Sequence, residues 1–241
     1  MLSADRQRGL TLVELMIAGV ISLLALSAVL TVYSATARHG ALQLQSAHLN
    51  EQVLGMLHLI GRDLRRAGYR HFDPARESSA ANPFQQGDNR LHIGASPGEP
   101  AGSCILFAYD LDQDGLVGVG QCPQAGCPPS SDADNVEQFG FRLRDGAVQS
   151  RYGGTGLGCD AGYWQALSDP DIHVTRLRFV LHTHCINLDT ADAACDGTAA
   201  QLLQRVVSID IGARSDTTPD TQLGLVQWVA VRNDRLQEAR R

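Results

Sequence analysis

Acidic side chains alternate along one short segment that ends in a glycine: Asp110, Asp112, Asp114 and Gly115. Ca²⁺ binds six to eight oxygen ligands, and alternating carboxylates before a glycine bend supply the first half of one known loop geometry. The twelfth position of such a loop carries a bidentate Glu, but here it is Gln121. The segment therefore predicts either a calcium site completed by Asp132, Asp134 or Glu137, or a solvated turn whose Asp side chains accept hydrogen bonds from backbone amides.

The cysteines could form disulfide bonds, because all six follow the apolar N-terminal segment and an even number there suits an oxidising compartment. Many pairings of six cysteines are possible. We favour the pairing that closes two short loops and leaves one long-range bond: Cys185 with Cys195, Cys122 with Cys127, and Cys104 with Cys159. The rival interpretation is a metal site in which His182, His184 and Cys185 lie on neighbouring positions of one strand.

Several classes of enzyme are excluded by composition, because all 20 basic residues are Arg and the chain has no Lys. A P-loop lysine, a Schiff-base lysine and a Ser-Lys dyad are therefore absent. The glycines of residues 153–158 fit neither a dinucleotide nor a phosphate loop, and no Gly-x-Ser-x-Gly motif occurs. The net charge of −6, without a basic patch, also disfavours nucleic acid as a partner. We expect a protein that is not an enzyme.

The N-terminus contains an apolar run from Leu10 to Tyr33 behind a short polar segment, MLSADRQRG, that carries Arg6 and Arg8. Positive charge on that side holds the leading segment in the cytoplasm. As a helix with a rise of ~1.5 Å per residue, the run spans about 36 Å and can cross a bilayer. Glu14 is the one charged residue inside it. A carboxylate is costly in hydrocarbon, so we expect Glu14 to have a specific use.

Two ordinary interpretations of this segment remain. A cleaved secretory signal would explain the small residues Ala35, Thr36 and Ala37, but the apolar run is longer than usual and contains a carboxylate. A simple signal anchor would explain the length but not Glu14.

The string Gly9-Leu10-Thr11-Leu12-Val13-Glu14-Leu15 resembles the class III signal of type IV prepilins and of type II secretion pseudopilins. The resemblance implies that a prepilin peptidase cleaves between Gly9 and Leu10 and that Leu10 becomes N-methylated. It also implies that Glu14 pairs with the N-terminal amine of a neighbouring subunit during assembly. This sequence departs from the pattern in having Leu10 where Phe or Met is more frequent.

An amphipathic pattern continues beyond the apolar run, without a proline between Leu10 and Asp73. Apolar residues recur at spacings of three, four or seven, as on one face of a helix: Leu42, Leu49, Val53, Met56, Leu57, Ile60, Leu64 and Ala67. Gly68 offers a helix stop, and Pro74 follows it. We therefore expect one helix of about sixty residues.

Strand patterns follow a polar segment at 72–100 that reads as a loop. The expected strands are 104–110, 136–144, 147–151, 172–182, 202–214 and 223–232, with Asp145-Gly146 as a hairpin turn between two of them. The fold class is thus α+β, with a long N-terminal helix on a mainly antiparallel sheet. The expected divisions are a leader at 1–9, a transmembrane half at 10–33, an amphipathic half at 34–70 and a periplasmic β-rich domain at 71–241.

The segment from Asp63 to Tyr69, the acidic turn and the stretch from Trp164 to Phe179 together resemble PilW-type minor pilins. The resemblance implies a subunit of the priming complex at a pilus tip, anchored in the bacterial inner membrane and present at the cell surface. Its partners would be other minor pilins, the major pilin, a tip adhesin, the prepilin peptidase and the inner-membrane assembly platform. The J-type minor pseudopilin of type II secretion is the second choice. A membrane-tethered periplasmic calcium-binding module that never polymerises is the alternative from another class.

Overall fold

A computed structural model describes residues 11–71, 82–115, 117–118, 136–154, 156–189, 195–196 and 199–237. The chain divides into two units, Met1–Ala47 and His48–Arg241. The first unit consists, in its described part, of helix only.

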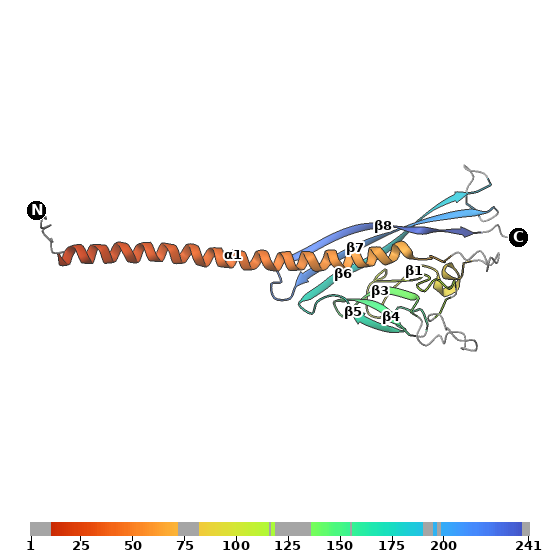
Figure 1. Ribbon diagram of the computed structural model, residues 1–241, viewed down its shortest axis with the longest axis horizontal. Coiled ribbons are helices and arrows are strands. Elements are labelled where there is room, and N and C mark those ends of the chain that lie inside the picture. Colours follow the sequence, from red (N-terminus) through yellow and green to blue (C-terminus); the bar gives the residue numbers. More distant parts are fainter. Residues whose placement is uncertain are drawn as a thin grey trace, which may run out of the picture. The chain divides into compact units, whose positions relative to one another are not determined.

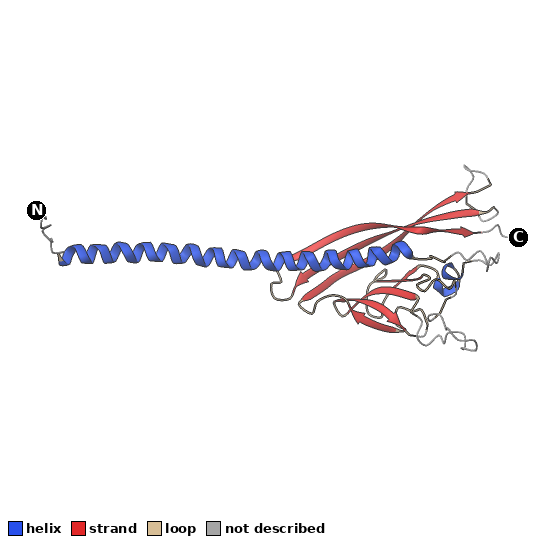
Figure 2. Cartoon of the chain, in the orientation of Figure 1, coloured by secondary structure: helices blue, strands red, loops and turns tan. Residues whose placement is uncertain are grey.

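The helix α1 runs from Leu12 to Arg66 (Figures 1 and 2). All of its residues up to His39 are exposed to solvent, although most of them are apolar. Leu23, for example, is 68% exposed. By length and composition, α1 is the helix in the described part of the chain that could cross a membrane. The predicted long helix is therefore present, at 55 residues.

Burial of α1 begins inside the second unit, where the predicted apolar stripe faces a core. The stripe residues of α1 from Leu49 onward are buried, as is Ala67 just after the helix: Leu49, Val53, Met56, Leu57, Ile60, Leu64 and Ala67. Leu42, which was predicted on the same stripe, lies in the first unit and is 49% exposed. The periodicity was thus correct, but it extends one position beyond the segment that has a partner to pack against.

The second unit has two antiparallel sheets, where the sequence predicted one. Within the described residues, the first has the order β1-β2-β3-β4-β5. Its strands are His92–Gly94, Cys104–Ala108, Gln138–Arg144, Ala147–Gly153 and Tyr163–Ala166. The second sheet is a meander of three long strands in the order β6-β7-β8 (Figure 1). These strands are Ile172–Asn187, Gln201–Ser215 and Gln222–Gln237. Two short 3₁₀ helices, η2 (Pro83–Gln85) and η3 (Gly87–Asn89), precede β1.

One hydrophobic core joins the end of α1 to both sheets. It contains Ile60 and Leu64 from the helix, Phe107 from β2, and Phe179 and Ile209 from the three-stranded sheet. None of these side chains is more than 2% exposed. Burying an aliphatic or aromatic side chain contributes about 1.5–3 kcal/mol, so this shared core fixes the helix end against the sheets.

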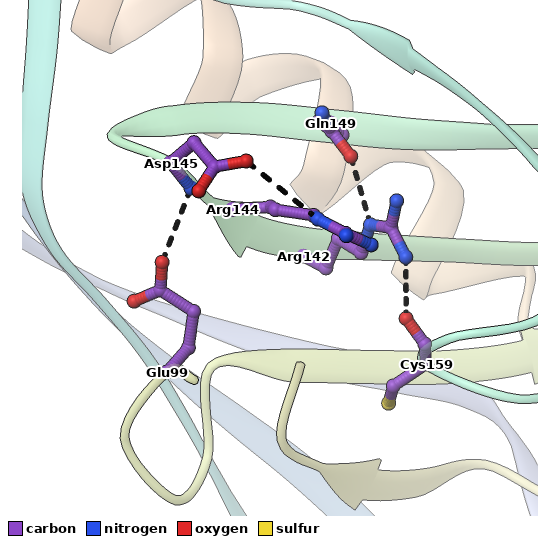
Figure 3. Close-up of polar contacts among 6 residues, drawn as sticks. All are labelled: Glu99, Arg142, Arg144, Asp145, Gln149 and Cys159. Atoms are coloured by element: carbon purple, nitrogen blue, oxygen red, sulfur yellow. Dashed lines mark hydrogen bonds and ion pairs between the residues drawn. The ribbon is translucent and has the colours of Figure 1, made fainter. Parts of the chain in front are cut away.

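The Asp145-Gly146 turn forms as predicted and joins β3 to β4, with Arg144 paired to Ala147. Both turn residues have positive φ, 53° and 74°, as a two-residue hairpin of this type requires. Figure 3 shows Glu99 accepting a hydrogen bond of 3.2 Å from the Asp145 amide. A Cβ on Gly146 would lie 2.4 Å from the His173 ring, so this position needs glycine for space as well as for conformation.

The C-terminal end of α1 is tied to both sheets by hydrogen bonds. Gly68 adopts φ 75°, and its amide donates to the carbonyl of Ala108, the last residue of β2, at 2.7 Å. The Asn233 amide in β8 donates to the carbonyls of Arg66 and Ala67 at 3.1 and 3.3 Å. The two Asn233 bonds satisfy carbonyls that a helix end leaves without partners.

Strict alternation along β6 would place Thr175 on the inner face of the strand. Thr175 is exposed instead, because β6 has a register shift between Val174 and Arg176, and Val174 is buried. Trp228 is 62% exposed on β8, where its ring lies 4.8 Å from that of His182. Trp164 is partly buried, with the Arg142 guanidinium 4.2 Å above its ring.

Candidate functional site

The first turn of α1 is closed by a reciprocal pair of hydrogen bonds between Thr11 and Glu14. The Glu14 amide donates to the Thr11 hydroxyl at 3.3 Å. In return, Glu14 Oε2 accepts from the Thr11 amide and from the Thr11 hydroxyl, each at 2.9 Å. This is the capping box, in which the N-cap side chain and the third helical residue satisfy each other's backbone amides.

Thr11 is the residue of this site that the sequence analysis missed. The spacing Thr11-Leu12-Val13-Glu14 is itself the signal, since Ser or Thr followed three residues later by Glu before an apolar run marks a helix start. The carboxylate also stands at the positive end of the helix dipole. Glu14 therefore has an intramolecular partner within its own helix.

Hydroxyl groups in the exposed apolar half of α1 bond back to the helix itself. Ser22 donates to the carbonyl of Ala18 at 2.7 Å, and Thr31 donates to that of Ala28 at 2.7 Å. Ser27, Ser34 and Thr36 make equivalent bonds. Polar groups in lipid need such internal partners, so these side chains are compatible with a membrane environment. Glu14 is then the one formal charge in the exposed apolar run that the structure describes.

The expected cleavage and methylation positions, Gly9 and Leu10, lie outside the described residues. Thr11 is the first residue described, so the capping box begins next to the expected cleavage point. Cleavage there would leave the Thr11 amide, and hence the box, intact.

The acidic turn brings its three carboxylates together, as the sequence analysis expected. One oxygen from each of Asp110, Asp112 and Asp114 lies within 4.8 Å of the others. Asp110 is 1% exposed. Both of its oxygens accept from backbone amides: Oδ1 from Gln113 at 2.7 Å, and Oδ2 from His71 at 2.8 Å and Gly115 at 3.0 Å. Asp110 therefore organises the turn and joins it to the segment after α1.

Glu137, the residue just before β3, supports the same turn. Its Oε1 accepts from the Leu111 amide at 2.8 Å and its Oε2 from the Gly118 amide at 2.9 Å. Burial, and to a smaller extent the charges of Asp112 and Asp110, raise the pKa of Glu137 to about 7, against the lowering effect of these two bonds. The turn thus concentrates negative charge in a buried place.

The fit of this cluster to calcium is partial. Carboxylate oxygens are the right donors for Ca²⁺, but backbone amides already occupy several of them. Gln121, Asp132 and Asp134 lie outside the described residues. The geometry accounts for Asp110 as a turn former, and calcium binding by Asp110, Asp112 and Asp114 stays a prediction.

Disulfide bonds join Cys104 to Cys159 and Cys185 to Cys195, which are two of the favoured pairs. Cys122 and Cys127, the third pair, lie outside the described residues. The bond at Cys185 removes the thiolate that the rival metal site required. That interpretation is therefore wrong for Cys185, and the His182 ring lies 3.2 Å from the Ser208 hydroxyl instead.

The Cys104–Cys159 bond is supported by a buried arginine, shown in Figure 3. Arg142 in β3 donates to the carbonyl of Cys159 at 2.6 Å and to Gln149 Oε1 in β4 at 2.8 Å. These bonds hold the loop that carries Cys159 against the first sheet.

Comparisons with known proteins match both the N-terminal segment and the β-rich unit. The family model described as "Prepilin peptidase-dependent protein B" matches residues 42–231. The model described as "Prokaryotic N-terminal methylation motif" matches residues 5–30. A protein of Haemophilus influenzae described as uncharacterized is 25% identical over 155 residues, which are 54% of this chain and 65% of that protein. The match thus spans less than two thirds of the relative, and no solved structure matches the chain.

The apolar helix with its acidic residue, the methylation motif and the α+β unit that follows agree with the type IV pilin-like resemblance found in the sequence. Proteins of this class are minor pilins or pseudopilins, and they depend on the prepilin peptidase for processing. The chain belongs to the prepilin peptidase-dependent protein B family.

Proposed function

We propose that the protein is a minor pilin that helps to prime or cap a type IV pilus and so supports pilus-dependent adhesion and motility. In this proposal it is processed between Gly9 and Leu10 and methylated at Leu10. It is held in the inner membrane by residues 10–33, with the β-rich unit in the periplasm and then on the filament. Its role is structural and not catalytic.

The observation that carries the proposal is Glu14, placed at the start of an exposed apolar helix with Thr11 as its partner in the described chain. A carboxylate with only hydroxyl and amide partners is poorly stabilised in hydrocarbon. The amine created by cleavage on a neighbouring subunit would supply the missing positive charge. Assembly would then relieve a cost that the isolated subunit bears in the membrane.

The partners under this proposal are the major pilin, other minor pilins, a tip adhesin, the prepilin peptidase and the inner-membrane assembly platform. The match to the "Prepilin peptidase-dependent protein B" model supports the peptidase most directly.

The test replaces Glu14 and follows the protein through processing and assembly in the bacterium that produces it. Glu14→Gln should insert into the membrane and be cleaved, because the apolar run is unchanged. The variant should be absent from filaments sheared from the cells. Glu51→Gln is the matched control, since Glu51 is also an exposed acid of α1 but lies outside the apolar run. Normal incorporation of Glu14→Gln would overturn the pairing role.

Deleting the gene separates a pilus component from a secretion component. Loss of surface pili and of twitching motility, with protein export unchanged, is the expected result. Loss of export with normal pili would instead identify a J-type pseudopilin. Mass spectrometry of the isolated protein supplies a second check, because a chain that retains residues 1–9 would contradict any filament role.

A further inference from the structure

A pocket of about 350 Å³ lies between β1 and the ends of β6, β7 and β8 in the second unit. Its walls combine three arginines with aliphatic side chains: Arg90, Arg205, Arg235, Ile93, Leu181 and Leu203. A concave site with an apolar surface and a few charged groups is the usual form of a small-ligand site. Nothing in the proposed filament role uses this pocket.

Arg205 is the group in the pocket that most needs a partner. Arg205 is 5% exposed, and its Nη2 donates to the carbonyl of Asn233 at 2.6 Å. Its Nε is buried and has no hydrogen-bond partner. A buried donor without an acceptor is costly, and the cost is greater for a charged group.

Arg142, another buried arginine, shows how the chain can satisfy the Nε and Nη groups of a guanidinium from within. Arg142, 6% exposed, uses Nε for Gln149 and Nη1 for Cys159. In Arg205 the Nε and Nη2 edge is only half used, by a single backbone carbonyl. That edge is the fork that binds a carboxylate through two parallel hydrogen bonds.

The electrostatics of the pocket favour an anion. In the described part of the chain, no carboxylate forms an ion pair with Arg205, and the oxygen of Asp234 accepts instead from Gln204 at 3.5 Å. Burial lowers the pKa of Arg205, the like charge of Arg235 lowers it further, and Asp234 acts in the opposite direction. A bound anion would offset both the burial and the repulsion.

The backbone of β8 has a bulge beside this pocket. Leu203 of β7 pairs with Arg235 of β8, and Arg205 of β7 pairs with Val231 of β8. Between these two pairs β8 therefore has extra residues opposite Gln204. Such bulges re-aim side chains and often lie beside binding sites. Here the bulge turns the Asn233 carbonyl toward Arg205 and brings Arg235 to the rim of the same pocket.

We propose that this pocket binds a carboxylate carried on a short apolar chain, with Arg205 as the buried anchor and Arg235 and Arg90 at the opening. The apolar chain would lie on Ile93, Leu181 and Leu203. The source of such a carboxylate is either a free carboxylic acid or the acidic side chain of a peptide.

The experiment uses the full chain in a zwitterionic detergent and follows the Arg Nε–H signals by NMR while hexanoate is added. We expect a saturable shift of the Arg205 signal in the millimolar range. Hexanol, which has the same chain length without the charge, should give no saturable shift. Inorganic phosphate should bind more weakly than hexanoate because it lacks the apolar part. A second titration with the capped tripeptide acetyl-Leu-Glu-Leu-amide distinguishes the two sources, since the tighter of the two probes identifies the source.

Substitutions locate the binding. Arg235→Gln should weaken hexanoate binding by about tenfold, the effect expected for one charged hydrogen bond. Arg205→Gln should abolish it, and Arg235→Gln keeps the test valid if the buried variant fails to fold. Arg214→Gln is the matched control, because Arg214 lies on β7 of the same sheet but outside the pocket. An Arg205 signal that does not respond to hexanoate, or equal shifts with hexanol, would show a solvent-filled pocket and overturn the proposal.

Discussion

At the scale of single residues, Thr11 and Glu14 place a charge where an apolar segment begins and give it two donors within the same turn. The pattern needs only the correct spacing in sequence, so it could be read from the sequence as soon as the helix start was known. Glu14 could also be predicted as functional, because a single carboxylate in an apolar run is costly in hydrocarbon. Its partner Thr11 carries a signal in the same spacing, but that signal was missed.

Thr11→Val should destabilise the first turn of α1, because it removes the N-cap hydroxyl and one hydrogen bond to Glu14. We expect amide hydrogen exchange at Leu12–Leu15 to become about fivefold faster, the effect of losing about 1 kcal/mol of capping. Exchange would be measured on the full chain in detergent. Thr31→Val is the matched control, since the Thr31 hydroxyl bonds only to Ala28 within the helix. Equal effects of both substitutions would show that the capping box has no special role.

The pKa of Glu137 predicts a pH dependence of stability. Burial raises this pKa from 4.5 to about 7, so the folded state binds more protons than the unfolded state between these values. The contribution of Glu137 to the free energy of unfolding should therefore be greatest below about pH 4.5 and should be lost as the pH rises through 7. Melting temperatures in buffer with a chelator would show the trend. In Glu137→Gln the fall across this window should be smaller, and an unchanged profile would mean that another group is responsible.

Calcium binding at the acidic turn is tested by isothermal calorimetry on the full chain in detergent. If the prediction holds, calcium should bind with measurable heat and raise the melting temperature. Asp112→Ala should remove the effect, whereas Asp88→Asn, an exposed acid elsewhere in the chain, should leave it unchanged. Absence of both heat and melting shift in the parent protein would leave the turn as a purely structural feature.

At the scale of elements, the periodic segments were predictable and the short ones were not. α1 and the long strands β6, β7 and β8 repeat apolar residues over enough positions to reveal their period. β1 has three residues and β5 has four, which is too short for alternation to be recognised. Their pairing with β2 and β4 depends on tertiary contacts. A local pattern therefore could not define them.

The buried face of α1 makes a sharp prediction for one helix position. Ile60→Ala should lower the free energy of unfolding by about 2–5 kcal/mol, because Ile60 is fully buried and its removal leaves a cavity. Leu54→Ala is the matched control, since Leu54 is on the same helix but 49% exposed. Its expected effect is within about 1 kcal/mol. Denaturant unfolding of both variants in detergent measures the difference, and similar losses would contradict the assigned face.

At the scale of the whole molecule, the fold class and the long apolar helix could be predicted from the sequence, whereas the pocket could not. Arg205 stands in a strand pattern where a basic residue would ordinarily face solvent. Its burial results from the β8 bulge and from the approach of β1. Exposure of Trp228 has a similar origin, because the sequence does not state which face of an edge strand meets the core. Features that arise from the packing of one sheet against another cannot be read from either strand alone.

The two described disulfides should contribute unequally to stability. The Cys104–Cys159 bond encloses a sequence separation of 55, and the Cys185–Cys195 bond a separation of 10. Loop entropy then predicts losses of roughly 4 and roughly 3 kcal/mol when each pair is replaced by alanines. Denaturant unfolding of the two double variants would test this order. A larger loss from the shorter loop would show that local packing, and not chain entropy, dominates.

The hydrogen bonds at the end of α1 also determine how the second unit would respond to mechanical force. A pull transmitted along the helix would reach Gly68, whose amide is bonded to Ala108, and the carbonyls of Arg66 and Ala67, which are bonded to Asn233. The tension would thus be divided between the two sheets at the same point.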